Sequence, residues 1–487
     1  MKKLFSLFLA VMMFLPALMS CGESKENTDA AENTAGSEAG TNPTVQTEPE
    51  TEEDPLSDGL PDTDLAGYDF RIYSMLWTDG VETAARMISD EFTGDAINDA
   101  LRESTIGVED RFNCTIRMIE GGDVWHIAAN VTNSIQAGDD AFEIVGGHDG
   151  TMTNLMNQGL FYNIKKVPQF NFDKPWWGPS KVLEINGKMY LASSYLSYTG
   201  LHWTRALMTN KRIFGDLGFE IPYETVREGI WTFDRMIAMT ENTYVDLNGN
   251  GKKDIKDQIG LCTGVETFYC LQESLDISPY HRNSDGTITM DFDIERMDSV
   301  VNKLRDLNKT DGFTYKSDSA FTSEIFKTDV SMMVLGQIAD AYEVYRDCEF
   351  PYGFLPCPKY DENQKNYISG CTDLPWAIPK TVTDAQIDII GTVVEALSAK
   401  NYAGVLPVYF ETVMKARIAD SPDDAEMLQI IADGRTISFA MQYGLEYYNT
   451  LKELIVGNKE VASYYQGKAE AAQNKLDTLI ESFDEWQ

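Results

Sequence analysis

Short apolar runs alternate along the chain with longer segments in which apolar residues recur every three or four positions. Residues 69–75 (DFRIYSM), 114–118 (CTIRM) and 142–146 (FEIVG) have the length and the β-branched and aromatic content of strands. Apolar residues recur at helical spacing in residues 95–112 and again after Asp149, which is the expected N-cap of its helix. Strands that alternate with helices predict an α/β domain with a largely parallel sheet.

The last third of the chain has helical spacing almost throughout. Ile387, Ile390 and Val394 fall on one face of a helix. Residues 421–423 (Ser-Pro-Asp) have the form of an N-cap followed by proline at the first helical position, and an apolar periodic run follows them. We therefore predict a helical C-terminal region in addition to the α/β part.

Residues that follow predicted strands are the first candidates for a binding site. In open α/β sheets, ligands bind beyond the carboxyl ends of the strands. Trp77 follows the first predicted strand, and His148 and Asp149 follow residues 142–146. We expect these three residues to contact a ligand. A turn that leads into the next helix also explains His148 and Asp149, and the two roles are compatible.

The chain begins with a charged and then an apolar segment. Two lysines precede an apolar stretch over residues 4–19, which is the pattern of a secretory signal peptide. Residues 18–21 (Leu-Met-Ser-Cys) resemble the bacterial lipobox, in which the cysteine is lipidated after the signal is removed. This predicts a lipoprotein signal peptide over residues 1–20 and lipidation of Cys21. The alternative is an ordinary cleaved signal beside an unmodified cysteine.

Residues 21–65 differ in composition from everything that follows. From residue 22 to residue 64 the chain is rich in Glu, Thr, Ser, Ala, Gly and Pro and has no aromatic residue. Such a segment buries too little apolar surface to offset the entropy lost on ordering, so it should be disordered. We expect an acidic tether that holds the folded body away from a membrane, with lipid as the only membrane contact.

Charge and motif content exclude several function classes. The chain has 77 acidic and 40 basic residues, a formal net charge of −37, and a surface this acidic repels nucleic acid. With four histidines and no G-x-S-x-G, H-E-x-x-H or P-loop motif, we predict that the protein is not an enzyme. Six cysteines follow Cys21, and their pairing stays open. The body is long enough for two lobes.

Residues 246–257 (DLNGNGKKDIKD) have oxygen donors at loop positions one, three, five, nine and twelve and a glycine at position six. That spacing is close to an EF-hand loop, in which a sharp turn converges six to eight oxygens on Ca²⁺. The twelfth residue is aspartate instead of the usual glutamate, and an Asn-Gly turn without metal is the alternative. The expected ligands of this structural Ca²⁺ are Asp246, Asn248, Asn250, Lys252 through its backbone carbonyl, Asp254 and Asp257.

Several separated segments carry a family resemblance in a fixed order. They are 98–116 (NDALRESTIGVEDRFNCTI), 141–161 (AFEIVGGHDGTMTNLMNQGLF), 187–194 (GKMYLASS), 207–222 (LMTNKRIFGDLGFEIP), 325–336 (IFKTDVSMMVLG), 352–359 (YGFLPCPK) and 369–380 (SGCTDLPWAIPK). Together they resemble family 1 extracellular solute-binding proteins, the capture components of bacterial ABC importers. Each segment alone is a weak signal, and the order over nearly the whole body makes the signal strong.

The resemblance implies a two-lobed α/β fold, the periplasmic-binding-protein type 2 fold, with an interlobe ligand cleft. By analogy, lobe one comprises residues 66–199 and 367–405, and lobe two comprises residues 200–366 and 406–487. The chain crosses between the lobes more than once, and domain closure around a ligand is the behaviour of this architecture.

The resemblance also implies a function. The protein is expected to be an extracytoplasmic, lipid-anchored monomer that captures a solute, most often a sugar in this family, and delivers it to ABC transporter permease subunits. Sugar rings stack on aromatic side chains, so Trp203 and Trp376, near the crossings, join Trp77, His148 and Asp149 as expected ligand contacts.

Two departures leave the sugar unnamed. Gly146 stands about where the maltodextrin-binding branch carries a tryptophan, and Gln337 and Ile338 replace an aromatic of that branch. Binding of a peptide or another metabolite, and a non-transport role as a surface sensor or adhesin, stay open as alternatives.

Overall fold

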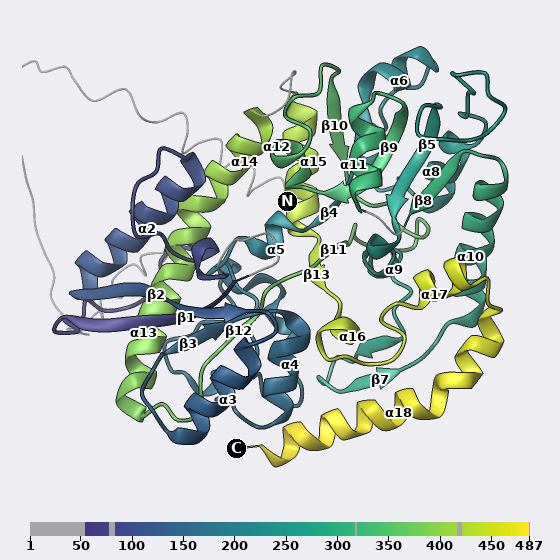
Figure 1. Cartoon of the computed structure of the whole chain (residues 1–487). Helices are drawn as coiled ribbons and strands as arrows, with labels where there is room; N and C mark the ends of the chain where they lie inside the picture. The colour runs from purple at the N-terminus through teal and green to yellow at the C-terminus, as the bar shows by residue number, and fades with distance from the viewer. Residues whose placement is uncertain (1–53, 77–82, 317–318, 416–420, 487) are drawn as a thin grey trace, which may run out of the picture. The chain divides into compact units, whose positions relative to one another are not determined.

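The first sheet has four strands in the order β12–β3–β1–β2 (Figure 1). A computed structural model describes residues 54–76, 83–316, 319–415 and 421–486. β1 (Tyr68–Leu76) lies parallel to β2 (Cys114–Asp123) and to β3 (Ile144–Gly146), while β12 (Trp376–Ala377) runs antiparallel to β3. The three predicted strands are confirmed. β2 continues to Asp123, beyond the predicted end, because its pairing with β1 extends that far.

Helices flank this sheet and complete lobe one. α2 (Ala96–Phe112) packs beside α13 (Asp384–Lys400), and α3 (Ile127–Ala137) packs beside α4 (Asp149–Asn157). The predicted helix over 95–112 is confirmed, and the carboxylate of Asp95 caps it by accepting from two backbone amides.

The N-cap of α4 is His148, which corrects the expectation that Asp149 holds this position. His148 has extended backbone angles, and its side chain accepts from the amide of Gly150, so Asp149 is already the first helical residue.

The second sheet has five strands in the order β10–β4–β9–β5–β8 and forms the centre of lobe two. Its strands are β4 (Arg205–Asn210), β5 (Ile259–Gly264), β8 (Phe313–Lys316), β9 (Ser331–Gln337) and β10 (Tyr352–Leu355). β5 is parallel to both of its neighbours, whereas β4 is antiparallel to β9 and to β10. The first six residues of β9 are all buried, as expected of a strand covered on both faces.

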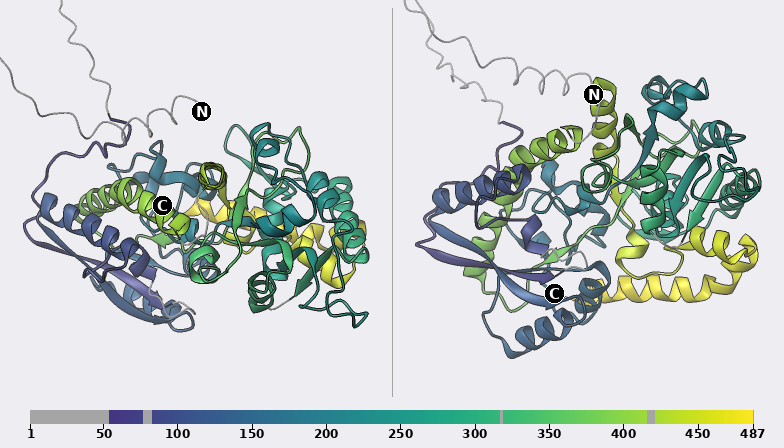
Figure 2. Two further views of the ribbon diagram at one scale, coloured as in Figure 1. Left: turned by 90° about the horizontal axis from the view of Figure 1, so that it is seen from above. Right: turned by 45° about the horizontal axis from the view of Figure 1, so that its top comes forward.

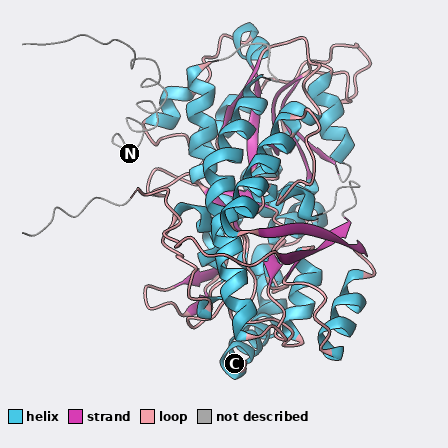
Figure 3. Ribbon diagram, turned by 90° about the vertical axis from the view of Figure 1, so that its left-hand side faces the viewer, coloured by secondary structure: helices cyan, strands magenta, loops and turns pink. Residues whose placement is uncertain are grey.

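Further helices and a hairpin cover the two sheets (Figure 3). They are η1 (Thr83–Arg86), η2 (Ile164–Lys166), η3 (Pro175–Leu183), α5 (Thr199–His202), α6 (Lys211–Asp216), α7 (Tyr223–Arg227), α8 (Phe233–Thr240), η4 (Val265–Thr267), α9 (Phe268–Ser274), β6 (Tyr280–Arg282), β7 (Ile288–Met290), α10 (Ile294–Lys309), α11 (Ser319–Lys327) and α12 (Asp340–Glu343).

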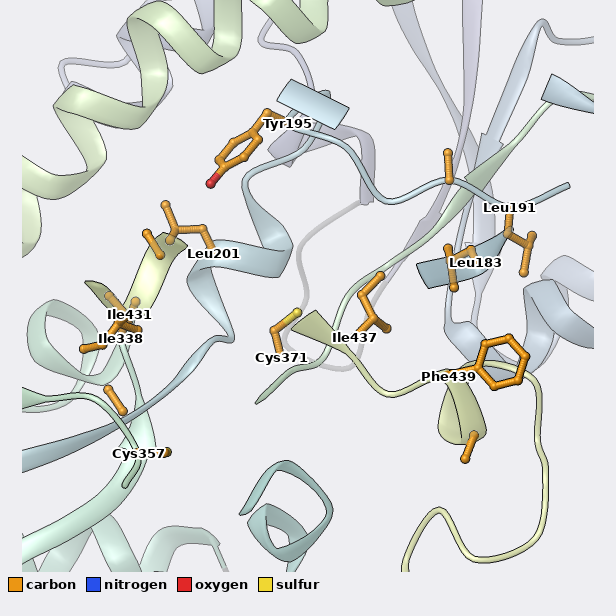
Figure 4. Packing of buried hydrophobic residues seen from close by; sticks show 14 of the residues in the cluster. Leu183, Leu191, Tyr195, Leu201, Ile338, Cys357, Cys371, Ile431, Ile437 and Phe439 are labelled. Carbon is orange, nitrogen blue, oxygen red and sulfur yellow. The ribbon is translucent and has the colours of Figure 1, made fainter. Parts of the chain in front are cut away.

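Two crossing segments connect the sheets. One passes from residue 192 through α5 to β4, and the other returns through β11 (Ser369–Cys371) to β12. Isolated bridges join Ala192 to Trp376 and Thr204 to Cys371, so the two segments touch at both ends. β11 also pairs in parallel with β13 (Arg435–Ile437), and Figure 4 shows the side chains of Cys371 and Ile437 close together. These segments are the connections between the two sheets.

The C-terminal part is helical, as predicted. A π-helical turn (Asn401–Val405) joins α13 to α14 (Leu406–Lys415), and Ser421 caps α15 (Pro422–Asp433) as expected. The later helices are α16 (Phe439–Gln442), α17 (Thr450–Gly457) and α18 (Val461–Glu485).

This C-terminal part contacts both lobes. α14 packs on α2, and α16 packs on α4. The long yellow helix α18 ends near the blue elements of lobe one (Figure 2). There Lys188 Nζ donates to the carbonyls of Phe483 (2.6 Å) and Trp486 (2.5 Å), the residues at the end of α18. Residues 406–487 were expected in lobe two, but α14, α16 and the end of α18 also contact lobe one.

A carboxylate lies inside the core of lobe one. Glu395 of α13 is fully buried, and its two oxygens accept from the indole nitrogens of Trp176 (3.0 Å) and Trp177 (2.9 Å). Burial raises the pKa of Glu395 to about 7, against the opposing effect of the two indole N–H groups. The tryptophan pair is thus a core feature of lobe one, held by its own buried acceptor.

The cysteines after residue 21 are buried free thiols, which resolves the open question of their pairing. They are Cys114, Cys262, Cys270, Cys348, Cys357 and Cys371. No helix in the described ranges combines the length and the apolar character that a membrane span needs.

Candidate functional site

The carboxyl ends of three parallel strands meet at one edge of the first sheet. Leu76 at the end of β1 is in register with Asp123 of β2, and Ser74 is in register with Gly146 of β3. The segments that leave this edge are Val124–His126 after β2 and Gly147–Asp149 after β3. We call it the lobe-one edge. Trp77 was predicted to lie at the same edge, but it is outside the described residues.

His148 and Asp149 lie at the lobe-one edge, where the sequence predicted them. The amide of Gly150 donates both to Asp149 Oδ1 (2.6 Å) and to His148 Nδ1 (3.2 Å). Burial raises the pKa of Asp149, and His148 and the Gly150 amide oppose that rise. His148 remains partly exposed, so an imidazole is available to a ligand above a buried carboxyl group.

Trp125 is an edge residue that was not among the predicted ligand contacts. It follows β2 and exposes 82% of its surface. The strand predicted here ended at residue 118, so the sequence placed Trp125 in an unassigned loop. Gly-Gly-Asp is typical of a turn, but residues 121–123 belong to β2, so no local signal in the sequence places Trp125 at the edge.

A second group of polar side chains lies at the corresponding edge of the second sheet, the lobe-two edge. Arg205 begins β4 directly opposite Gln337 at the end of β9, and its Nη1 donates to Gln337 Oε1 (3.0 Å). Asp340 follows, and its Oδ2 accepts from the Gln337 amide (2.9 Å). Burial raises the pKa of Asp340 to about 6, against the opposing effects of the Gln337 amide and Arg205. The group offers donors and acceptors of the kind that bind hydroxyls.

The return crossing links the two edges. The amide of Gly147 donates to the carbonyl of Pro375 (3.1 Å) at the lobe-one edge. Three residues earlier, the hydroxyl of Thr372 is hydrogen-bonded to that of Tyr269, which belongs to α9 after β5. One short segment therefore holds the carboxyl end of β3 and the carboxyl end of β5 together, although these strands belong to different sheets.

Trp203 lies on the outgoing crossing, at the end of α5. It is 9% exposed, and the guanidinium of Arg86 lies over its ring, 5.0 Å from the centroid. The neighbouring His202 is buried between Tyr342, whose hydroxyl lies 2.9 Å from Nδ1, and Glu343, 3.1 Å from Nε2. The crossing thus brings an indole and an imidazole next to the lobe-two edge.

Trp376, a predicted ligand contact, lies in the hydrophobic core. Only 1% of its surface is exposed, its Nε1 donates to Ser194 Oγ (3.2 Å), and its ring packs against Phe170 and Trp177. Position near a crossing predicted a ligand contact, whereas burial makes this indole part of the core beneath the lobe-one edge.

Carboxylates of the loop over residues 246–257 accept hydrogen bonds from other residues of the same loop. Asp246 accepts from the amides of Gly249 (2.7 Å) and Gly251 (2.8 Å), two glycines with positive φ. Asp254 accepts from the side-chain amides of Asn248 (3.1 Å) and Asn250 (2.8 Å). The side chains at positions three, five and nine therefore lie together, while that of position one holds the glycine turn.

Asp257, the twelfth position of this loop, points elsewhere. Its oxygens accept from the amides of Leu247 (3.2 Å) and Asp254 (2.9 Å) and from the hydroxyl of Tyr244 (3.2 Å). Across the described ranges, no three His, Cys, Asp or Glu side chains are grouped as a metal site. A cation in this loop would therefore depend on amide and backbone oxygens, including the carbonyl of Lys252, as well as carboxylates.

Comparison with solved structures shows which proteins have a similar fold. No family model and no curated protein matches the chain. A cyclo/maltodextrin-binding protein solved with maltotetraose is similar to it with a TM-score of 0.52 at 13% identity, covering 88% of this chain and 97% of that one. The maltose/maltodextrin-binding domain MalE of Bdellovibrio bacteriovorus, bound to maltotriose, has a TM-score of 0.51 at 15% identity, covering 85% and 100%.

A third similar structure is a family 1 extracellular solute-binding protein from Bifidobacterium longum subsp. infantis. It has a TM-score of 0.50 at 13% identity and covers 85% of this chain and 99% of that one. Likeness over whole chains at such low identity is a likeness of fold. The chain has the two-lobed α/β fold of extracellular solute-binding proteins, which confirms the fold predicted from its sequence.

Proposed function

We propose that the protein is an extracytoplasmic solute-binding protein that captures a sugar or oligosaccharide and delivers it to the permease subunits of an ABC importer. One observation carries this proposal: the segment over residues 372–375 is hydrogen-bonded to both lobes and so connects the lobe-one edge with the lobe-two edge. A ligand held between these edges contacts both lobes, so it can favour their closed arrangement.

The chemistry of the two edges supports a sugar. Sugar hydroxyls both donate and accept, and the lobe-two edge offers a guanidinium, an amide and a carboxyl group within hydrogen bonds of one another. Sugar rings also present C–H faces to indoles such as Trp203. Two solved proteins of this fold support a sugar as the solute, since one was solved with maltotriose and the other with maltotetraose. We propose binding without catalysis, as a monomer.

Purified protein is expected to melt at a higher temperature in the presence of one or more members of a panel of neutral sugars, because a ligand that binds only the folded state stabilises it. In the variant Trp203→Ala, affinity for that sugar should fall about tenfold, the usual effect of removing an aromatic contact residue. Trp486→Ala, which removes an indole packed on Tyr190 at the end of α18, is the matched control and should bind as the wild type does.

The same panel separates the alternatives. Stabilisation by peptides or amino acids instead of sugars would indicate a binding protein of another substrate class. If nothing on the panel raises the melting temperature, sugar capture is contradicted. A role as a surface sensor or adhesin then becomes the better-supported hypothesis.

We also propose that Cys21 is lipidated and anchors the protein to the cell membrane. The support is the order of a charged start, an apolar stretch, a lipobox-like tetrapeptide and an acidic tether. Two or more acyl chains give stable membrane attachment. A mature protein that begins at Cys21 with the mass of a diacylglyceryl group would agree, and an unmodified thiol would contradict this.

We further propose a structural Ca²⁺ in the loop over residues 246–257. Its support is the convergence of two asparagine side chains on Asp254. In the structure the oxygens of Asn248 and Asn250 accept from the amides of Asn250 (3.0 Å) and Lys252 (2.7 Å), so a cation that takes these oxygens as ligands has to replace the two hydrogen bonds. Millimolar Ca²⁺ should then raise the melting temperature and EDTA should lower it, with an affinity of about 0.1–1 mM typical of extracellular modules.

The variant Asp246→Ala tests this site. Asp246 also accepts two backbone amides, so the variant is expected to be less stable even without metal. The decisive quantity is therefore the response to Ca²⁺ and not the melting temperature itself. An Asp246→Ala protein that responds to Ca²⁺ and EDTA as strongly as the wild type would show that the loop holds no metal.

A further inference from the structure

Residues 182–190 of lobe one contact a hairpin of lobe two and the C-terminal region. This segment comprises the end of η3 and a turn at Asn186 and Gly187, both of which have positive φ. It is fixed to lobe one, because the amide of Ile164 donates to the carbonyl of Met189 (2.8 Å). The outgoing crossing begins directly after it. Contacts from this segment to lobe two therefore add to the connections that the crossing segments provide.

Side chains from outside lobe one cap the end of η3. The last carbonyls of a helix have no partner within the helix, so they need donors from elsewhere. Arg282 of β6 donates through Nη2 to the carbonyls of Val182 (3.1 Å) and Glu184. Tyr443, directly after α16, donates through its hydroxyl to the carbonyl of Leu183 (2.6 Å). Three successive carbonyls of lobe one thus accept from the hairpin and the C-terminal region.

The end of α18 is capped in the opposite direction, by side chains of lobe one. Lys188 Nζ donates to the carbonyls of Phe483 (2.6 Å) and Asp484 (3.1 Å), and Asn186 Nδ2 donates to the carboxylate of Asp484 (2.9 Å). A lysine here also interacts favourably with the partial negative charge of the helix C-terminus. The acceptors of Lys188 are backbone carbonyls, so a side-chain truncation such as Trp486→Ala leaves them in place.

α18 connects this contact to lobe two. It packs on α10, which in turn packs on β8 of the second sheet, and the rings of Phe292 and Tyr465 are stacked with centroids 4.7 Å apart. From α10 the helix runs toward lobe one (Figure 1). Its 25 residues give a length of about 37 Å. A helix that is packed on lobe two at one end and capped by lobe one at the other resists any change in the distance between those points.

These capping contacts can break without opening the core. Arg282 is exposed and Lys188 is half-buried. Water replaces the partner when an exposed hydrogen bond breaks, so the net contribution of each bond is small. Ser369, Gly370 and Cys371 of the return crossing are all buried in contrast. The caps are therefore interlobe contacts that can be exchanged for contacts with water when the lobes move.

We propose that these reciprocal caps form an interlobe latch, made of residues 182–190 on one side and of Arg282, Tyr443 and the end of α18 on the other. The latch holds the lobes in one relative arrangement and opens when a solute stabilises another. It contributes no group to the lobe-one edge or the lobe-two edge, so it changes affinity only through the population of the arrangement that binds the solute. The inference rests on the proposed function, because a solute that contacts both lobes is what moves them.

Distances between the lobes, measured by double electron–electron resonance, test the latch without any solute. Spin labels are attached at Glu103→Cys in α2 and Asn308→Cys in α10, two exposed positions, in the full chain carrying Cys21→Ala. The six other native cysteines are buried. In the latch variant, Lys188→Met with Arg282→Met, the donors are lost and the apolar stems are kept. Its distance distribution should broaden or shift by more than the width of the wild-type peak.

Arg117→Met with Lys303→Met is the matched control. It removes the same two charges, but Arg117 pairs with Asp69 inside lobe one and Lys303 pairs with Asp234 inside lobe two. The control should keep the distance distribution of the wild type. If the latch variant also keeps it, or if the control broadens as much as the latch variant, the inference is overturned.

Titration calorimetry with a sugar identified by the melting-temperature panel measures the effect on binding. The latch variant should change the affinity about fivefold or more, the lower end of the range for coupled sites, and the control should not. A rise shows that the latch favours the unbound arrangement, and a fall shows that it favours the bound one. An unchanged affinity overturns the regulatory role while sugar capture stands. If no sugar binds the wild type, sugar capture fails, and the distance measurement still decides whether the latch holds the lobes.

Discussion

Replacing Glu395 with alanine is expected to lower the free energy of unfolding by about 2–6 kcal/mol. The carboxylate accepts from the indole nitrogens of Trp176 and Trp177, and all three side chains are fully buried. The variant leaves two buried N–H donors without an acceptor, and each such donor destabilises by about 1–3 kcal/mol. Chemical denaturation followed by tryptophan fluorescence measures both the loss and the changed surroundings of the indoles.

Glu395→Gln tests the charge at the same position, because the amide keeps the shape and does not titrate. It accepts from only one of the two indoles, so its stability should be lower by an amount that does not depend on pH. Burial raises the pKa of Glu395 from 4.5 to about 7 in the folded protein. A carboxyl group with a raised pKa contributes stability that is fully present below about pH 4.5 and is lost as the pH rises through about 7. The wild type should therefore lose stability relative to Glu395→Gln between pH 5 and pH 8. A difference that does not change with pH would show that Glu395 keeps one protonation state throughout.

Replacing Gly370, on the return crossing, with alanine should lower the free energy of unfolding by about 1–3 kcal/mol, the usual effect of overpacking a closed site. A Cβ at this position of β11 would lie 2.8 Å from Cys270 Cα and 3.1 Å from Cys270 O. These are backbone atoms of α9, so the clash can be relieved only by moving β11 away from lobe two. Thr372, two residues further on, would be moved from its hydrogen bond with Tyr269.

Gly467→Ala is the matched control for this variant. Gly467 lies within α18, is exposed, and has nothing within 4 Å of the position of a Cβ. There the same substitution should stabilise by about 0.5–1 kcal/mol, because alanine favours a helix over glycine. Thermal melts of the two variants should therefore move in opposite directions. If both move the same way, β11 and α9 are not packed as closely as the structure has them.

Strand and helix types were predictable because they depend on short-range patterns. The runs at 69–75 and 114–118 became β1 and β2, and Asp95 and Ser421 cap helices as their side chains indicated. The boundary of β2 was not predictable, because a polar stretch that ends in Gly-Gly-Asp is held in the sheet only by pairing with β1. That extension is also what puts Trp125 at the lobe-one edge.

The sequence by itself determined the α/β alternation, the helical C-terminal region and the choice of His148 and Asp149, because each follows from local periodicity or from position at a strand end. Only the tertiary structure decided which tryptophans are available to a ligand. Trp376 and Trp125 both lie close to strands, yet the first is packed beneath the lobe-one edge and the second is exposed above it. Burial depends on segments far apart in the chain, and the interlobe link through Thr372 arises only when β3 and β5 have been brought together in space.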